Sequence, residues 1–202
     1  MARTQTEPAS RTRLLDAALA LIRTKGYAAT TVDDICAAAG LTKGSFFHHF
    51  RTKEELAVAA ATHFGARAEA LFAQAPYRAL PDPLDRLLGY VAFRKAMLHG
   101  ELPEFTCLLG TLVQEAFATH PAIRAACEAQ IDAHAATVSR DIAEARALYA
   151  ADAGWSAESL AVYTQAVLQG AFVLAKAKGG PAVAADCLDH LRRYLELLFN
   201  RN

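Results

Sequence analysis

Short helices with capping residues at their ends dominate one segment of the chain, TTVDDICAAAGLTKGSFFHHFRTKEEL at residues 30–56. Thr31 is placed to cap a first helix, whose apolar residues recur at helical spacing and are followed by Gly40. A glycine at that point readily takes the left-handed conformation that ends many helices. Thr42 is placed to cap a second helix of about two turns, and residues 53–56 open a third. This order of helix, turn and short helix predicts a helix-turn-helix motif.

The second helix of this motif has a polar and basic face. Thr42 and Lys43 stand at its start, where a hydroxyl, an ammonium group and free backbone N–H groups suit a phosphate. Side chains in the next turn are placed to reach base edges in the major groove. The alternative is an ordinary three-helix corner with a polar surface. We favour DNA binding, and the candidate DNA-binding residues are Thr31, Thr42, Lys43, Gly44, Ser45, Phe47, His48, His49 and Lys53.

The run from Leu14 to Leu56 resembles the amino-terminal domain of the TetR family of one-component transcriptional regulators. The match lies in T-T-V-D-D-I-C-A-A-A-G-L-T-K-G-S-F-F-H-H-F-R-T-K-E-E-L and in the Gly26-Tyr27 pair that ends the preceding helix. The resemblance implies an all-helical dimer with a small DNA-binding domain and a larger ligand-responsive domain, usually in a repressor.

Position by position, the resemblance also implies functional residues. It places DNA contacts at Thr42, Lys43, His48 and His49, and a phosphate contact of the fourth helix at Lys53. The family most often has Tyr where this chain has Phe47, so the phenol hydroxyl that would bond a phosphate is missing here. Any contact from Phe47 is then apolar, for example with a thymine methyl group.

Charge is balanced over the whole chain but not along it. The 202 residues include 21 Lys and Arg and 21 Asp and Glu, hence a net charge of zero. Residues 1–56 hold eight basic and six acidic residues, and the remainder holds thirteen and fifteen. A weakly basic N-terminal segment followed by a mildly acidic remainder is compatible with DNA binding by the N-terminal segment. We expect residues 1–9 to form a flexible arm, and we expect Arg3, Arg11 and Arg13 to add nonspecific attraction for phosphate.

Motifs typical of enzymes and metal sites are missing from the sequence. It contains no G-x-S-x-G, no H-E-x-x-H, no glycine-rich phosphate loop and no E-x-x-H pair. Cysteines at positions 36, 107, 127 and 187 form no C-x-x-C pair and no disulfide-rich spacing. The sequence therefore predicts no catalytic residues, no metal and no cofactor. Residues 1–13 are polar, and we see no uncharged run of eighteen apolar residues, so we expect a cytoplasmic protein that does not enter the membrane.

Helical spacing continues to the end of the chain and predicts an all-α fold of about nine helices. A helix-turn-helix domain is expected at residues 10–52 and a ligand-binding and dimerisation domain, built as a helical bundle, at 53–202. Residues 76–83 are expected to form a linker. The expected longer helices cover residues 10–25, 53–74, 84–98, 105–118, 122–150, 156–178 and a final segment that ends at Phe199.

The last two helices each have a broad apolar stripe that can pack within the chain or against a second copy. A short recognition helix contacts few bases, and a dimer doubles that contact. The resemblance places the dimer interface on these helices, so we predict a homodimer. Its predicted interface residues are Tyr163, Val167, Gly170, Ala171, Leu174, Leu188, Leu191, Tyr194, Leu195 and Leu198.

Aromatic residues in the second domain suggest a pocket for a small-molecule effector, with Tyr90 or His134 as a polar group. For any one of them, simple core packing is the alternative. The candidate ligand-binding residues are Phe93, Met97, Phe105, Cys107, Phe117, His134, Trp155 and Tyr163.

Residues 107–115 resemble a C-L-x-G-x-L-x-x-E segment found in a subgroup of TetR regulators, some of which sense electrophiles through its cysteine. By position that cysteine is Cys107, and the usual preceding glycine is Thr106 here. A thiol near a helix N-terminus can become nucleophilic, whereas a buried free cysteine is commonly only a small apolar side chain.

Two classes of function remain after these observations. The favoured one is a ligand-responsive regulator, most often a repressor, that binds a palindromic double-stranded DNA operator as a homodimer and leaves it when a small hydrophobic or electrophilic effector binds. The alternative is a helical small-molecule-binding or scaffold protein without specific DNA recognition.

Overall fold

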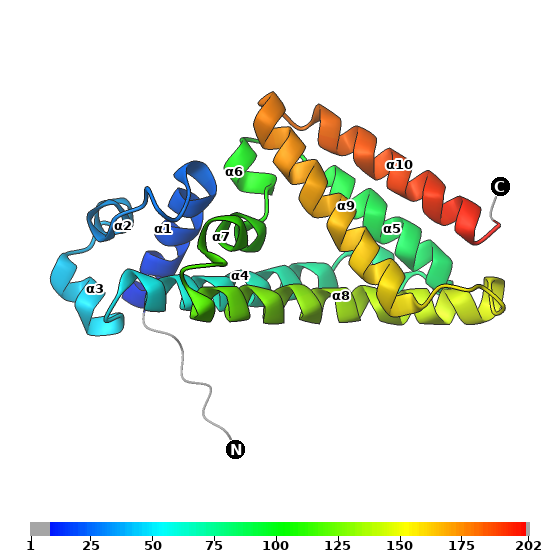
Figure 1. The fold of residues 1–202 in the computed structure, drawn as a ribbon, viewed down its shortest axis with the longest axis horizontal. Coiled ribbons are helices and arrows are strands. Elements are labelled where there is room, and N and C mark those ends of the chain that lie inside the picture. Colours follow the sequence, from blue (N-terminus) through cyan, green and yellow to red (C-terminus); the bar gives the residue numbers. More distant parts are fainter. Residues whose placement is uncertain (1–8, 201–202) are drawn as a thin grey trace, which may run out of the picture. The chain divides into compact units, whose positions relative to one another are not determined.

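The computed structural model describes residues 9–200, which form ten α-helices, one short 3-10 helix and no strand (Figure 1). Nine of the α-helices have seven or more residues, so the prediction of an all-α fold with about nine helices is confirmed. The elements are α1 (Ala9–Lys25), α2 (Val32–Ala39), α3 (Lys43–His49), α4 (Lys53–Ala73), η1 (Pro76–Ala79), α5 (Pro83–Ala96), α6 (Leu102–Phe105), α7 (Leu108–Ala116), α8 (Pro121–Tyr149), α9 (Ala157–Lys178) and α10 (Ala182–Leu198).

The described residues divide into two compact units. The first unit contains the chain up to Ala66 together with Leu108–Gln130, and the second contains Arg67–Cys107 together with the chain from Ile131 onward. These units differ from the expected domains at 10–52 and 53–202, because α7 packs against α1 and so belongs to the first unit. The expected arm at residues 1–9 lies outside the described residues except for Ala9, which begins α1.

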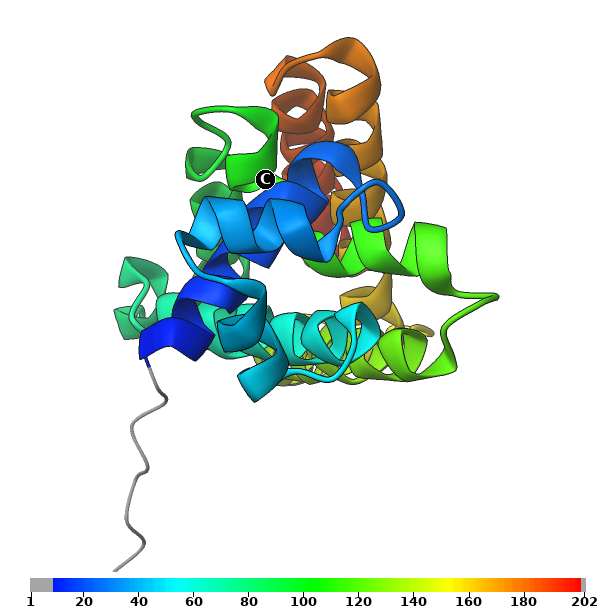
Figure 2. The same cartoon turned by 90° about the vertical axis from the view of Figure 1, so that its left-hand side faces the viewer.

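In the first unit, α1, α2 and α3 pack around a small apolar core (Figure 2). Thr31 caps α2 with its hydroxyl oxygen, which accepts the backbone N–H of Asp34, and the Asp34 carboxylate accepts the backbone N–H of Thr31 in return. Gly40 ends α2 at a φ of 60°, in the left-handed region. Thr42 caps α3 by accepting the backbone N–H of Ser45 at 3.2 Å. The caps predicted at Thr31, Gly40 and Thr42 are therefore confirmed.

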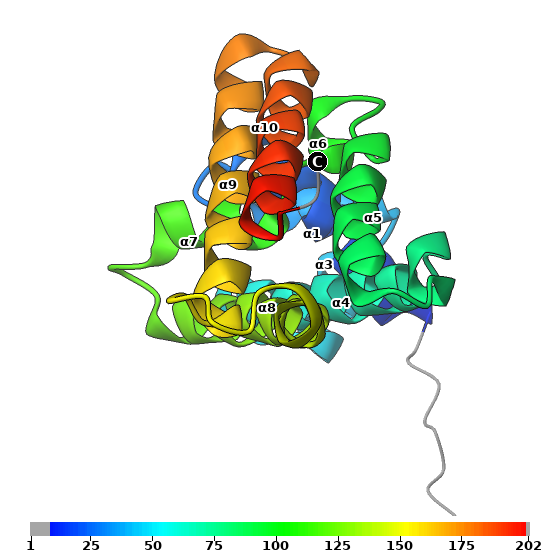
Figure 3. The same cartoon turned by 90° about the vertical axis from the view of Figure 1, so that its right-hand side faces the viewer.

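The second unit is built from α5, α9 and α10, which lie side by side, with η1 and parts of α4 and α8 (Figure 3). Leucines and alanines of α5, α9 and α10 form most of its core. Asp141 of α8 is buried and accepts hydrogen bonds from Arg78 of η1 and Arg86 of α5 at 2.5 and 2.8 Å. A buried carboxylate needs such partners, and this pair of arginines joins three elements of the unit.

Two expected elements have different bounds. The helix expected at residues 105–118 is two helices, α6 and α7, because Thr106 has an extended backbone and ends α6. Its hydroxyl donates to the carbonyl of Leu102 at 2.8 Å, which holds the break. The expected linker at residues 76–83 contains η1, which begins at Pro76 and buries Tyr77.

Among the described residues, helix α9 alone is long and apolar enough to match a membrane-spanning helix by length and composition. It has 22 residues and a mean hydropathy of 1.2 over its most apolar window, which meets the length and composition of a membrane-spanning helix. The core helix of a soluble protein meets the same criterion. Within the second unit α9 buries Leu160, Leu168 and Phe172, so its apolar character is used in packing.

Substitution of Phe46 should destabilise the protein far more than substitution of its neighbour. Phe46 is 0% exposed and contacts the ring of Phe50, whereas 57% of Phe47 is exposed. We expect Phe46→Ala to lower the free energy of unfolding by about 3–5 kcal/mol and Phe47→Ala to change it by less than about 0.5 kcal/mol. Urea unfolding followed by circular dichroism measures both, and equal losses would contradict the packing described.

Candidate DNA-binding surface and effector-binding core

Helix α3 presents the predicted DNA-binding face on the first unit. Thr42, Lys43, Gly44, Phe47 and His48 are exposed, and Ser45 is half-buried. The opposite side of α3 buries Phe46, so the helix has one face for the core and one for solvent. The exposed face combines a hydroxyl, an ammonium, an aromatic ring and an imidazole within two turns, which are groups that contact phosphates and base edges.

Lys43 already has an anionic partner on the surface of the protein. Its ammonium lies 2.8 Å from a carboxylate oxygen of Asp33 on α2, and this hydrogen bond raises the pKa of Lys43. Both side chains are well exposed, so the pair is weak and open to exchange. A DNA phosphate would have to replace Asp33 as the partner of Lys43.

Lys53 is oriented differently from the predicted phosphate contact. Its ammonium donates to the backbone carbonyls of Tyr27 and Thr30 at 3.0 and 2.9 Å and lies 4.2 Å from the centre of the Tyr27 ring. Burial lowers the pKa of Lys53. Two of its three N–H groups hold the loop between α1 and α2, so at most one remains for a phosphate.

Three further residues of the first unit bind other parts of the protein. His49 Nε2 lies 2.7 Å from the hydroxyl oxygen of Ser10, which ties α3 to α1, so this imidazole is not a free base-reading group. Arg13 donates to the backbone carbonyls of Ala39 and Gly40 and thereby supports the C-terminus of α2. Arg11 lies over the Phe50 ring at 5.1 Å. The nonspecific phosphate attraction expected of Arg11 and Arg13 is therefore at most a secondary role.

Sequence reasoning did not identify Glu115 as a residue of this site. Its carboxylate accepts the backbone N–H of Ala28 at 2.9 Å, and a side chain at Gly26 would meet that carboxylate at 2.4 Å. Gly26 also has a φ of 87°, which favours glycine. Glu115 and Lys53 thus hold the same loop, residues 26–31, from α7 and α4. The only sequence signal was that Glu115 is the last residue of the C-L-x-G-x-L-x-x-E segment.

The predicted dimer residues divide into two groups. Ala171, Leu188, Leu191 and Leu195 are buried in the core of the second unit, so they are not surface residues as the interface prediction required. They face the adjacent helix of the pair, which is why they share an apolar stripe. The other predicted residues are exposed or half-buried, namely Tyr163, Val167, Gly170, Leu174, Tyr194 and Leu198.

The second group lies on the outer face of α9 and α10. The rings of Tyr163 and Tyr194 are 5.1 Å apart and join the two helices across this face. Val162, Val173 and Leu197 add exposed apolar surface that the prediction missed. We call the exposed apolar residues of α9 and α10 the outer α9–α10 face.

A polar cluster lies inside the second unit. The Tyr90 hydroxyl is 2.9 Å from Nε2 of His134 and accepts a hydrogen bond from the Gln165 amide at 3.2 Å. Burial lowers the pKa of His134 to about 4, with a further contribution from the charge of Arg94, so this imidazole is neutral at pH 7. Phe72 contacts both Tyr90 and His134 with its ring. The two residues proposed as alternative polar groups, Tyr90 and His134, therefore bond to each other.

The candidate ligand-binding residues do not all lie near the polar cluster of Tyr90, His134 and Gln165. Phe105 is buried in the core of the second unit, and Phe93, Met97, Cys107 and Trp155 are partly buried against it. Phe93 meets the ring of Phe72 edge to face, and Phe72 also contacts His134.

Within the described residues, three of the candidates have no ring contact with Tyr90, His134 or Phe72. Phe117 belongs to the first unit and is 58% exposed, so it is not part of this core. Trp155 packs on Phe199, and Tyr163 is exposed on the outer α9–α10 face. The aromatic composition could not separate these different environments.

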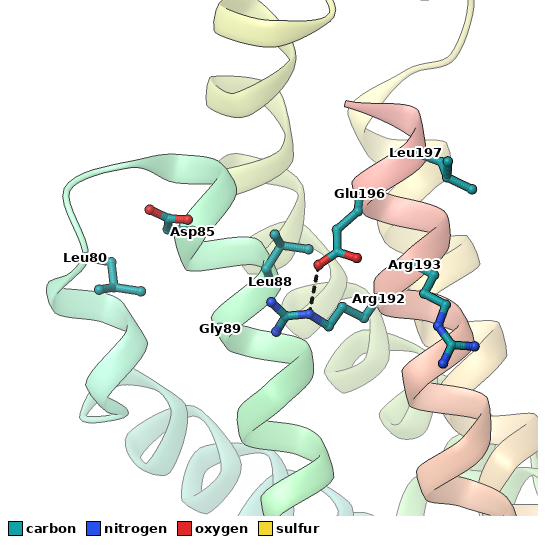
Figure 4. Close-up of a pocket in the computed structure, with 8 residues that line it drawn as sticks. All are labelled: Leu80, Asp85, Leu88, Gly89, Arg192, Arg193, Glu196 and Leu197. Carbon is teal, nitrogen blue, oxygen red and sulfur yellow. Dashed lines mark hydrogen bonds and ion pairs between the residues drawn. The ribbon is translucent and has the colours of Figure 1, made fainter. Parts of the chain in front are cut away.

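A groove of about 660 Å³ lies elsewhere on the second unit (Figure 4). It is lined by Leu80, Asp85, Leu88, Gly89, Arg192, Arg193, Glu196 and Leu197. None of the predicted ligand-binding residues lines it. Across residues 9–200, no group of three His, Cys, Asp or Glu side chains is arranged to hold a metal ion.

Comparison with known proteins identifies both parts of the chain. Residues 14–60 match the model of bacterial regulatory proteins of the tetR family, and residues 83–191 match the model of the tetracyclin repressor-like C-terminal domain. A solved structure, the regulatory protein TetR from Rhodobacter sphaeroides, is 28% identical, with a TM-score of 0.81 over 94% of this chain and 98% of that one.

Curated relatives are similar over a shorter stretch. The HTH-type transcriptional repressor KstR2 of Mycobacterium tuberculosis is 39% identical over 94 residues, which cover 44% of each chain. The transcriptional regulator AcuR of Cereibacter sphaeroides is 33% identical over 113 residues, or 56% of this chain and 52% of that protein. The chain thus spans about half the length of these relatives or less.

The half-buried, neutral His134 should make stability depend on pH. Its pKa falls from 6.5 in the unfolded chain to about 4 in the folded protein, so the unfolded state binds the extra proton first as pH decreases. The stability gained by keeping His134 neutral in the folded protein is therefore fully present above pH 6.5. The free energy of unfolding then falls by about 1.4 kcal/mol per pH unit as pH decreases from 6.5 toward 4.

The measurement is the difference in unfolding free energy between the unaltered protein and His134→Gln, by urea unfolding from pH 7.5 to 4.5. Taking the difference removes the contributions of other titrating groups. A difference that stays constant over this range would contradict a lowered pKa for His134 in the folded protein.

Proposed function

Because the chain belongs to the TetR family of bacterial regulatory proteins, we propose that it represses transcription by binding a roughly palindromic DNA operator as a homodimer, and that a small effector releases it. The observation that carries this proposal is the exposed face of α3, with Lys43 and His48 on a helix capped by Thr42. The coarser statement, a ligand-responsive regulator of this family, rests on the family matches themselves.

In the proposed complex α3 enters the major groove with its N-terminus against the backbone. The free N–H groups of its first turn and the Lys43 ammonium would bind phosphates. His48 is exposed one turn further on and is the best-placed residue to reach a base edge. His49 and Lys53 would act mainly by orienting α3 and the preceding loop, since both are bonded within the protein.

The outer α9–α10 face supports the homodimer. Isolated apolar residues on a surface need no explanation, but this face has Tyr163, Leu174, Tyr194 and Leu197 exposed on two neighbouring helices. Two such pairs from two copies would form a four-helix interface with twofold symmetry. The dimer would place two α3 helices in successive major grooves, about one helical turn apart.

Effector release needs a connection between the second unit and the DNA-reading helices. Cys107 directly precedes α7, and Glu115 near the end of α7 holds the loop that leads into α2. We propose that effector binding or thiol modification displaces α7 and thereby loosens this loop. Only a difference in effector affinity between the two conformations would shift the population.

Salt dependence of DNA binding tests the role of α3. Fluorescence anisotropy on DNA flanking the protein's own gene should give tight, sequence-preferring binding that weakens with salt, against an unrelated DNA control. Lys43→Ala should weaken binding on all sequences and reduce the salt slope by about one, whereas Asp33→Asn should strengthen binding because it frees Lys43. His48→Ala should instead change the preferred bases.

Two results would contradict the proposed docking. One is an unchanged affinity and slope in Lys43→Ala, which the alternative of a scaffold or small-molecule-binding protein predicts. The other is an equal loss on all sequences in His48→Ala, which would exclude base reading by that residue.

Release by an electrophile tests Cys107. The thiolate sulfur adds to one carbon of the N-ethylmaleimide double bond, and the neighbouring carbon takes up a proton. This modification should release the protein from DNA. Cys107→Ser should bind DNA normally and resist release. Cys187→Ser is the matched control, because Cys187 is the other half-exposed cysteine. Release that persists in Cys107→Ser would rule out this thiol as a sensor.

A further inference from the structure

Arg94 of α5 is a partly buried cation without an anionic partner. Its guanidinium carbon lies 5.2 Å from the centre of the Phe72 ring and 5.5 Å from that of Phe172. No carboxylate among residues 9–200 forms an ion pair with it. The other basic residues of the same helix are matched, since Lys95 pairs with Asp189 at 2.7 Å and Arg86 with Asp141 at 2.8 Å.

Arg94 is partly buried, so it loses part of its hydration without gaining an ion pair. Charged groups that are taken out of water are normally paired with an opposite charge. The hydration free energy that they lose is larger than their interaction energy with neutral neighbours. The two aromatic faces attract the cation, but this attraction is weaker than that of a carboxylate partner. Residues that lower stability in this way are characteristic of binding sites.

The groups around Arg94 are suited to an acid with an apolar body. Phe72 contacts the rings of Tyr90 and His134 as well as the Arg94 guanidinium, so the cation borders the polar cluster of the second unit. Burial and the nearby charge of Arg94 keep the pKa of His134 low, so this imidazole adds a neutral hydrogen-bonding group and no negative charge. The rings of Phe72 and Phe172 lie beside the guanidinium and offer apolar surface.

We propose that Arg94 is the anion-binding residue of the effector site and that the effector is a small organic acid with an apolar body. The guanidinium would donate two parallel N–H bonds to the carboxylate, a geometry that arginine provides and lysine does not. Phe72 and Phe172 would contact the apolar part. The proposal rests on the proposed effector-responsive function and specifies the chemistry of its ligand.

The groove of Figure 4 is a poorer candidate for such an acid. Arg192, which lines it, already pairs with Glu196 at 2.9 Å, and Asp85 adds a second carboxylate. Arg193 is exposed, so its charge remains hydrated. These differences make Arg193 a useful control for a general effect of arginine on anion binding.

Thermal stabilisation by matched probes tests the proposal on the full-length protein. The probes are benzoate, 1-naphthoate and octanoate, each compared with its own primary amide, which keeps the apolar body and removes the charge. A ligand that binds only the folded protein raises the midpoint temperature, and at equal concentration a tighter ligand raises it more. We expect at least one acid to raise the midpoint well above its amide, and Arg94→Met to abolish that difference.

Two further variants define the outcome. Arg94→Lys should restore part of the stabilisation because it keeps the charge, and Arg193→Gln should behave like the unaltered protein. The proposal is overturned if no acid stabilises the unaltered protein more than its amide, or if the difference persists in Arg94→Met. Arg94→Met should also bind operator DNA normally without probe. That separate measurement distinguishes failure of the effector site from failure of the proposed DNA-binding function.

Discussion

The burial of Phe46 and Phe50 is the interaction on which the DNA-reading surface depends. Helix α3 has seven residues, and a helix that short does not persist in water unless tertiary contacts hold it. Phe46 supplies those contacts from one face, and the Thr42 cap satisfies a backbone N–H at the start. The exposed residues of α3 therefore owe their fixed positions to two aromatic side chains that never contact a ligand.

The loop at residues 26–31 is the second point on which the first unit depends. A lysine from α4 holds two of its carbonyls, and a carboxylate from α7 holds one of its N–H groups. The loop also has local hydrogen bonds, since the Thr30 hydroxyl donates to the carbonyl of Gly26 and the Thr30 N–H donates to the carbonyl of Tyr27. The contacts from α4 and α7 therefore fix the position of a turn that is already closed by its own bonds.

The features that could be predicted well from the sequence are those that depend on residues close together in the chain. Caps at Thr31, Gly40 and Thr42 depend on neighbours within four residues, so they could be found from spacing alone. The inward orientation of Lys53 depends on carbonyls more than twenty residues away, and the contact of Glu115 with Ala28 spans 87 residues. Periodicity found the apolar stripes of α9 and α10. It could not separate residues that pack within the chain from those left exposed, because both kinds of residue are apolar.

The ion pair between Asp33 and Lys43 has a consequence for how the protein would search DNA. Each phosphate that binds Lys43 must first displace a carboxylate of the protein's own, so contact with DNA exchanges one partner for another. This competition weakens attachment to every sequence alike, including the very large number of wrong sites in a genome. The time that the protein would spend at a wrong site would shorten as its affinity for that site falls. In the proposed complex the aspartate would thus favour rapid scanning, at some loss of affinity for the operator.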